Sequence, residues 1–118
     1  SRTEIESAAS APHPEEPGRE VRFPPELRPP EFPRVFDPEL TVGWRFATPP
    51  GPVAFHDLAV GPRVIDPGAT IGDFIVWTRG RTPAYQLAVV VDDHRQGVTH
   101  IVRGNDLLDS AARQVLIY

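Results

Sequence analysis

The sequence predicts an α/β fold, because β-rich segments occupy its middle and a helical segment closes it. Apolar β-branched and aromatic residues gather between turn-forming Pro and Gly residues in segments 41–46, 53–60 and 72–79, which are expected to be strands. Ser110 is expected to cap a final amphipathic helix. With 118 residues, the chain has the length of one domain.

The composition excludes several kinds of chemistry. The sequence has no Cys and no Met, and all twelve cationic residues are Arg. It can therefore form no disulfide, thiolate nucleophile or lysine Schiff base. The net charge of −4 does not favour general nucleic-acid binding, and no apolar run approaches the ~18 residues of a membrane span. The absence of an initiating Met favours a piece of a longer protein.

Proline is concentrated near the start of the chain, where nine of fifteen lie between Pro12 and Pro38. Because proline fixes φ and lacks an N–H, segment 11–38 is expected to hold neither a regular helix nor a central strand. Two interpretations remain open: a flexible polyproline-like linker, or an extended chain whose spaced apolar residues pack on the rest of the protein. Segment 1–9 is expected to be a short helix.

Turn residues and apolar patterns divide the rest of the chain. Segments 63–68 and 80–83 are expected to be turns because of their Pro and Gly content. Beyond them, propensity alone predicts a buried strand over 87–91, and alternation predicts another over 98–103.

The most specific signal is a pair of motifs followed by Arg113-Gln114. The motifs read YQLAVVVDD (85–93) and GVTHIVRGNDLL (97–108). A Tyr, an apolar run and VDD, then GVTxIxRGxDLL and RQ, resemble the glutamyl/glutaminyl branch of class I aminoacyl-tRNA synthetases. Within that branch, GDFIVW (72–77) and the ending DLLDSAARQVLIY are most similar to the glutamyl-Q tRNA(Asp) synthetase family.

This resemblance implies part of a Rossmann-type catalytic domain with a Pro-rich, β-containing connective insertion. Residues 1–82 would be the insertion, with the Pro-rich arm at 11–38 and short strands over 41–79, and residues 83–118 would begin the second half of the domain. The resemblance also implies a helix over 87–95, against propensity, and a core strand over 99–103 with the ligand at its carboxyl end.

The resemblance further implies an ATP-dependent ligase. It would activate glutamate as an adenylate, with Mg in the whole enzyme, and transfer it to the queuosine base of tRNA(Asp). Tyr85 matches the family's amino-acid-binding Tyr, and Arg103 matches its substrate-binding Arg. Taken alone, Tyr85 is more often a packed core aromatic, and Arg103 more often a surface ion pair.

The other polar residues of the motifs have less specific roles. Asn105 and Asp106 would border the nucleotide and tRNA side, although a turn or cap explains Asp106 equally well. Asp92 and Asp93 point about 100° apart on a helix, so they are expected to cap or position rather than to act as a catalytic pair. The two histidines nearby, His94 and His100, are interpreted as structural or surface residues.

No metal is expected in this chain. The related family often carries a structural zinc on Cys residues and a Tyr within the insertion, but this sequence has no Cys, and His13 and His56 alone cannot complete a tetrahedral site. The expected partners are glutamate, ATP and tRNA(Asp), in a cytoplasmic monomer that does not bind membranes.

Two rivals and one limit accompany this prediction. The chain could instead correspond to a glutamyl-tRNA synthetase that charges the tRNA 3′ end, or to a non-catalytic interaction module built from a synthetase fold. The family's two ATP-binding signatures, one like HIGH and one like KMSKS, are absent from the sequence. The 118 residues alone are therefore expected to be inactive.

Overall fold

A computed structural model of the chain describes residues 22–31 and 35–118. Its elements are η1 (Pro25–Leu27), β1 (Trp44–Phe46), β2 (Val53–Asp57), β3 (Gly61–Ile65), α2 (Pro67–Thr70), β4 (Phe74–Trp77), α3 (Tyr85–Gln96), η2 (Asn105–Leu107) and α4 (Leu108–Ile117). The predicted mixture of strands and helices is confirmed. The predicted helix at 1–9 lies outside the described residues.

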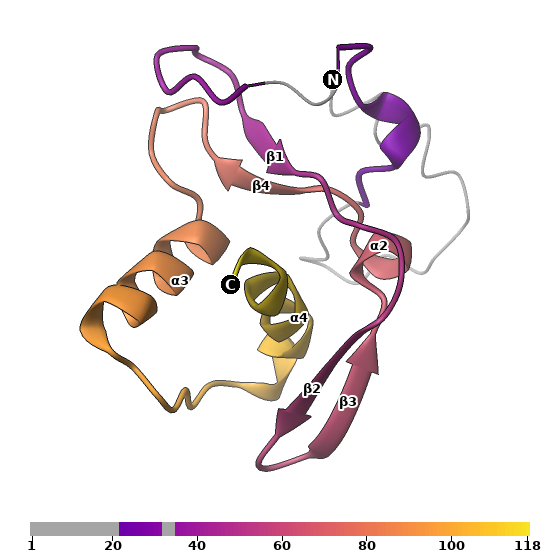
Figure 1. The fold of residues 1–118 in the computed structure, drawn as a ribbon, viewed down its shortest axis with the longest axis vertical. Helices are drawn as coiled ribbons and strands as arrows, with labels where there is room; N and C mark the ends of the chain where they lie inside the picture. The colour runs from indigo at the N-terminus through magenta and orange to yellow at the C-terminus, as the bar shows by residue number, and fades with distance from the viewer. Residues whose placement is uncertain (1–21, 32–34) are drawn as a thin grey trace.

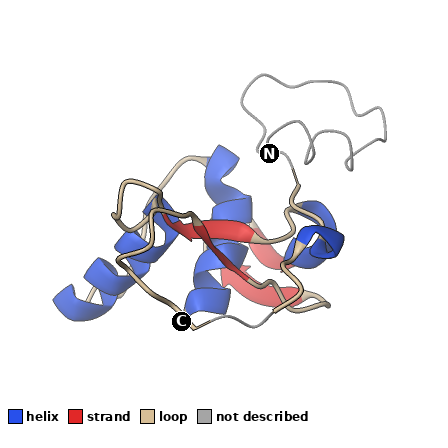
Figure 2. Cartoon of the chain, turned by 90° about the horizontal axis from the view of Figure 1, so that it is seen from above, coloured by secondary structure: helices blue, strands red, loops and turns tan. Residues whose placement is uncertain are grey.

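The strands form two separate antiparallel pairs (Figure 1). Strand β1 pairs with β4, with Phe46 opposite Phe74, and β2 pairs with β3 as a hairpin. The strands cross the middle of the molecule, with helical segments on both sides (Figure 2). The expected strands over 41–46, 53–60 and 72–79 are thus confirmed in shortened form.

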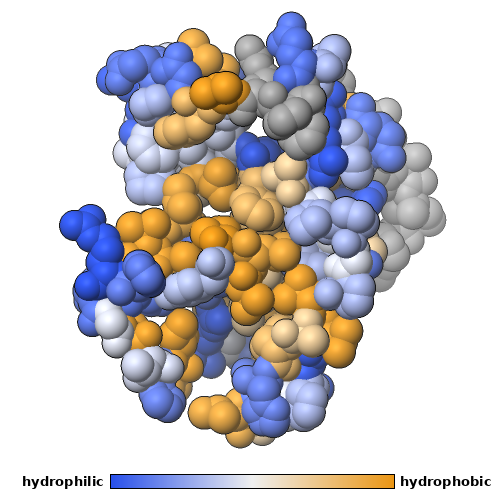
Figure 3. Space-filling view, in the orientation of Figure 1, coloured by the Kyte–Doolittle hydropathy of each residue, from blue (hydrophilic) through white to orange (hydrophobic). Residues whose placement is uncertain are grey.

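The core lies where β4 meets the two longer helices. Phe74 is 1% exposed and stacks on Phe46 with ring centroids 5.2 Å apart, while Val90 of α3 and Ala112 of α4 are also buried. Helix α4 packs against both α3 and β2. Figure 3 shows apolar side chains gathered in the middle of this face. None of the helices within the described ranges is long and apolar enough to cross a membrane.

The described part of the Pro-rich arm is packed on the strands. Phe23 exchanges backbone hydrogen bonds with Ile71 and Asp73, and its ring lies 4.2 Å below the Arg45 guanidinium. Phe36 makes edge contacts with Trp44 and Trp77. The packed-chain interpretation therefore holds for Phe23 and for the ring contacts of Phe36, but not for Val35, which is 90% exposed.

The turn predicted over 63–68 is wrong. Residues 61–65 form β3, and the chain then makes one helical turn, α2, which Asp66 caps by accepting from the Ala69 N–H at 3.0 Å. The reversal occurs earlier, after Asp57, whose carboxylate accepts the N–H groups of Ala59 and Val60. This carboxylate turn ends β2 at residue 57 and makes the hairpin. The turn predicted over 80–83 is confirmed, with Arg81 at φ 60°.

The strand that propensity predicts over 87–91 is also wrong, and the helix implied by the family resemblance is confirmed as α3. The helix ends at Gly97, which adopts φ 69° and donates to carbonyls of the last turn. Glycine adopts this left-handed conformation without a Cβ penalty. Burial of Val90 against β4 and α4 overrides the small helix penalty of the Val run, at most ~0.7 kcal/mol per residue.

Two further predictions near the carboxyl end fail. Segment 98–103 is not a strand, because no backbone within the described ranges pairs with it; Val102 is 99% exposed. A strand exists only with a neighbour that accepts and donates its ladder hydrogen bonds. Ser110 is not an N-cap, since α4 begins at Leu108 and Ser110 lies inside it, where its hydroxyl accepts from Gln86 instead.

Candidate functional site

The candidate site is an open cavity of about 320 Å³ between α3, the extended segment 98–103 and α4. The residues that line it are Tyr85, Val89, Asp93, Val98, His100, Ile101, Val102, Arg103 and Gln114. The two predicted glutamate-binding residues, Tyr85 and Arg103, therefore lie on one cavity. Its walls combine an apolar surface with a few polar groups, as small-molecule sites do.

Tyr85 lies at the start of α3 because the residues before it cannot continue a helix. Pro83 bridges to Trp77 at the end of β4, and Ala84 remains extended as the N-cap. The Tyr85 side chain is 55% exposed, so it is not a packed core aromatic. Within the described ranges its hydroxyl makes no hydrogen bond, which leaves that group available to a ligand.

Arg103 is half-buried at the end of the extended segment. Its Nη1 donates to Oε1 of Gln114 at 2.8 Å. No carboxylate of the described residues lies within ion-pair distance of this guanidinium, which is therefore not a surface ion pair. A guanidinium has five N–H donors, so most of its donor capacity remains for a carboxylate in the cavity.

A buried chain of side-chain amides supports Arg103. Gln114 Nε2 donates to Gln86 Oε1 at 3.0 Å, and Gln86 Nε2 donates to Ser110 Oγ at 2.9 Å. All three side chains are buried. Gln86 was not predicted as a residue of the site, and Gln114 was predicted only as part of a motif. One clue was present in the sequence: Gln86 follows Tyr85 directly, and Gln114 follows Arg113, and both neighbours belong to the family motif.

The remaining predicted residues are divided by the structure. Asp93 lines the cavity, whereas Asp92 is exposed and does not. Asn105 and Asp106 form the exposed turn η2, outside the cavity lining. His100 lines the cavity and shares a 2.9 Å hydrogen bond with the Thr99 hydroxyl.

His94 lies away from this cavity, at the end of α3. It is exposed and makes an edge contact with the ring of Tyr118, with centroids 6.3 Å apart. This placement agrees with a surface role.

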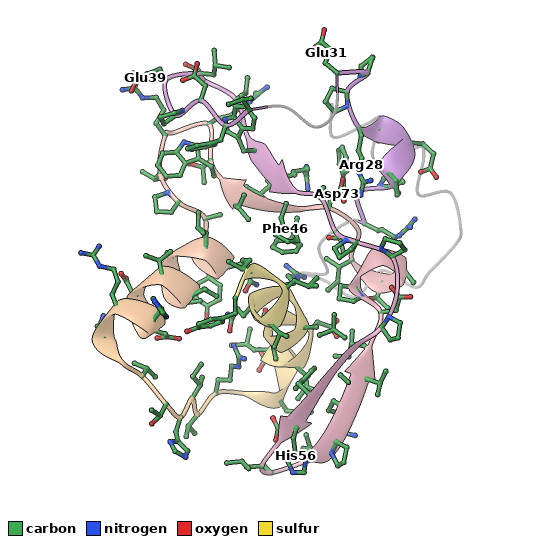
Figure 4. All side chains as sticks on the ribbon, viewed as in Figure 1. Arg28, Glu31, Glu39, Phe46, His56 and Asp73 are labelled. Atoms are coloured by element: carbon green, nitrogen blue, oxygen red, sulfur yellow. The ribbon has the colours of Figure 1, made fainter. Side chains whose placement is uncertain are left out.

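A second polar cluster lies on the far side of β4, near η1 (Figure 4). Asp73, 4% exposed, accepts from Nε of Arg28 at 2.7 Å, from Nη2 of Arg28 at 2.8 Å and from the Thr48 N–H at 2.9 Å. The hydrogen bonds to Asp73 hold the pKa of Arg28 above its ordinary value. We call Arg28, Thr48 and Asp73 the arginine clamp; it fastens the Pro-rich arm to the strands.

The residues of this chain do not fit a zinc site of the Cys type. The sequence has no Cys, and no group of three or more His, Asp or Glu side chains that could hold a metal gathers within 22–31 and 35–118. His56 lies near the tip of the β2–β3 hairpin (Figure 4). His13 lies outside the described residues.

Comparison with known proteins gives the family. Residues 37–118 match the model for class I tRNA synthetases (E and Q), catalytic domain. A Symbiobacterium thermophilum protein named glutamyl-Q tRNA(Asp) synthetase is 46% identical over all of this chain and 37% of its own length. A Caulobacter protein named glutamate–tRNA ligase is 42% identical over 75% of this chain and 22% of its own.

A solved structure agrees with these sequence matches. The glutamate-tRNA synthetase of Elizabethkingia anophelis superposes with a TM-score of 0.59 at 31% identity, over 63% of this chain and 15% of that one. The chain thus spans little more than a third of the length of the Symbiobacterium relative. It belongs to the class I tRNA synthetase (E and Q) catalytic-domain family.

Proposed function

We propose that the chain supplies part of the glutamate site of an ATP-dependent ligase that transfers glutamate to the queuosine base of tRNA(Asp). The observation that carries this proposal is the meeting of Tyr85 and Arg103 on one cavity, with no carboxylate of the described residues paired to Arg103. The names of relatives such as the Symbiobacterium protein support queuosine-containing tRNA(Asp) as the acceptor.

The chemistry of the cavity suits a zwitterionic amino acid that has a second carboxylate. Arg103 pairs with a carboxylate of glutamate, and the Tyr85 hydroxyl orients the substrate by a hydrogen bond. One carboxylate oxygen then attacks the α-phosphorus of ATP, pyrophosphate leaves, and an acceptor hydroxyl later displaces AMP. Holding the substrate in line for these steps supplies much of the rate enhancement, since effective molarities of oriented groups reach ~10⁵–10⁸ M. Asn105 and Asp106 belong to the nucleotide side in this proposal.

The domain division is part of the same proposal. Residues 1–82 form the connective insertion, and residues 83–118 begin the second half of the catalytic domain. The change of architecture at the turn before Pro83, from paired strands to packed helices, supports this boundary.

The rival acceptor is the 3′ end of a glutamate tRNA. The glutamate–tRNA ligase name of the Caulobacter relative favours it. Both readings share the glutamate site and differ only in the RNA that receives the glutamyl group.

The test uses a chimera in which these 118 residues replace the matched segment of the Symbiobacterium relative. Glutamate-dependent ATP–pyrophosphate exchange is measured first, followed by transfer of labelled glutamate to queuosine-containing tRNA(Asp), the same tRNA lacking queuosine, and tRNA(Glu). We expect exchange with glutamate, and transfer only to the queuosine-containing tRNA. Transfer to tRNA(Glu) would favour the tRNA 3′ end as the acceptor. ATP–pyrophosphate exchange that does not depend on glutamate would contradict the proposed glutamate site.

Matched variants connect the activity to the cavity. Arg103→Lys loses the planar fork, so the glutamate KM is expected to rise ~10-fold or more, in line with ~1.5–3 kcal/mol for hydrogen bonds to charged groups. Arg95→Lys, on the exposed end of α3, is the control. Equal effects of the two substitutions would remove Arg103 from the site.

A further inference from the structure

We infer that Gln114, held by Gln86, is the positioning residue of Arg103, and that its neutral amide preserves the positive charge that binds the substrate. This inference rests on the proposed glutamate site. The hydrogen-bond chain from Arg103 to Ser110 gives the arginine an uncharged partner.

The orientation of each amide in this series of hydrogen bonds follows from Arg103. A guanidinium only donates, so the Gln114 group that faces it must be the carbonyl oxygen. The amide nitrogen of Gln114 then faces Gln86 and must meet an oxygen, which turns the Gln86 nitrogen toward Ser110 Oγ. Each orientation fixes the next, and no member can flip alone without placing like groups in contact.

Burial makes the orientation rigid. Gln114 is 5% exposed, Gln86 7% and Ser110 8%, so water cannot easily replace a lost partner. Leaving a buried donor or acceptor unsatisfied costs ~1–3 kcal/mol. The Arg103 guanidinium is therefore tethered at Nη1, and its remaining N–H groups keep one direction in the cavity.

The same hydrogen-bond chain also influences the position of Tyr85, the other residue proposed to bind substrate. Gln86 follows Tyr85 in the first turn of α3, so its bond to Ser110 joins that turn to α4. The buried amides thus set the starting position of α3, which carries Tyr85, and the orientation of Arg103 together. Tyr85 and Arg103 are therefore positioned by the same buried hydrogen bonds.

The charge of the partner decides what Arg103 can bind. Glutamate at position 114 would satisfy Nη1 equally well, but it would neutralise the guanidinium from inside the protein. The amide donates and accepts without charge, so the cation stays available to an anion in the cavity. Asp93 is a carboxylate on the same lining, but it forms no ion pair with Arg103.

The decisive variant is Gln114→Glu in the chimera. Gln86 can rotate its amide by 180° and donate to the new carboxylate, while the Ser110 hydroxyl turns to donate to the Gln86 oxygen, so the fold is retained. We expect the glutamate KM in pyrophosphate exchange to rise ~10-fold or more, with a smaller change in kcat, because the lost contact is to bound substrate. Gln96→Glu, on the exposed last residue of α3, is the matched control and should change KM less than twofold.

A second measurement reads the tether without activity. In ¹⁵N spectra of the 118-residue chain, the tethered Arg103 guanidinium should give resolved Nη signals, which Gln114→Met should broaden and Gln96→Met should leave unchanged. Resolved Nη signals in Gln114→Met, or a Gln114→Glu KM within twofold of the parent chimera, would overturn the inference. A chimera with no glutamate-dependent exchange would instead overturn the proposed function, while the spectra still decide the tether.

Discussion

Two half-buried arginines of this chain have partners of different charge. Arg28 meets the buried carboxylate of Asp73 in a two-pronged ion pair, whereas Arg103 meets the neutral amide of Gln114. Arg28 belongs to the Pro-rich arm and reaches from it to the strands, whereas Arg103 faces an open cavity. An arginine therefore joins the Pro-rich arm to the strands in one place, and in the other it is available to bind a ligand.

The difference shows that the partner's charge, more than burial, assigns the role. Asp73 offsets the charge of Arg28, and the hydrogen bonds between them raise the pKa of the arginine. Gln114 fixes Arg103 in space without cancelling its charge. Substitutions that exchange or remove these partners should therefore affect stability at the clamp and ligand binding at the cavity.

The largest effect on stability is expected from Asp73→Ala. It removes the buried carboxylate that accepts from the Arg28 guanidinium and from the Thr48 N–H. Breaking a buried pair costs ~3–5 kcal/mol, and the 25% exposure of the Arg28 side chain places the expected loss near the lower end, ~3 kcal/mol. Urea unfolding measures it, with Asp92→Ala on exposed α3 as the control at less than ~0.5 kcal/mol. Equal midpoints for the two variants would contradict the clamp.

A smaller loss, still above ~2 kcal/mol, is expected from Gly72→Ala. Gly72 has φ 73°, and a Cβ there would clash with the Phe23 carbonyl oxygen, which joins the arm to the strands. Gly61→Ala is the matched control, because Gly61 has φ 81° but nothing within 4 Å of the added carbon. It should lose only the backbone strain, ~1 kcal/mol. If both variants lost the same amount, the arm would not be seated against Gly72.

Local chemistry explains which parts of the fold were predictable from the sequence. The three strand segments have β-rich residues between turn formers, and they were found to within a few residues. The hairpin turn was misplaced because the decisive group is the Asp57 carboxylate, while the Pro and Gly of 63–68 suggested a reversal that does not occur. Helix α3 contradicts its own propensity because packing of Val90 decides it, and that packing is not local.

Of the candidate site, only residues that face the cavity could be predicted from the sequence. Tyr85 and Arg103 are carried by the motif resemblance, and the structure brings them to one cavity. The amides behind them could not be predicted, because a buried Gln resembles an exposed one in sequence. Segment 98–103 was expected to be a strand because apolar and polar residues alternate in it. Alternation indicates which side chains share a face, but it does not show whether a neighbouring strand is present.

The smallest expected effect concerns Asp57, a carboxylate held by a turn and not by an arginine. The backbone N–H groups of Val60 and Ala59 lower the pKa of Asp57 below its ordinary value of 3.8. Since the folded pKa is the lower one, the stabilisation is fully present above pH 3.8 and disappears as the pH falls through the folded pKa. Asp57→Asn, which cannot titrate, should therefore differ from the parent chain in a way that shrinks below about pH 4. Amide exchange of the β2–β3 hairpin at several pH values measures this locally. A difference that stays constant between pH 3 and pH 6 would show that ionisation of the Asp57 carboxylate adds nothing to the turn.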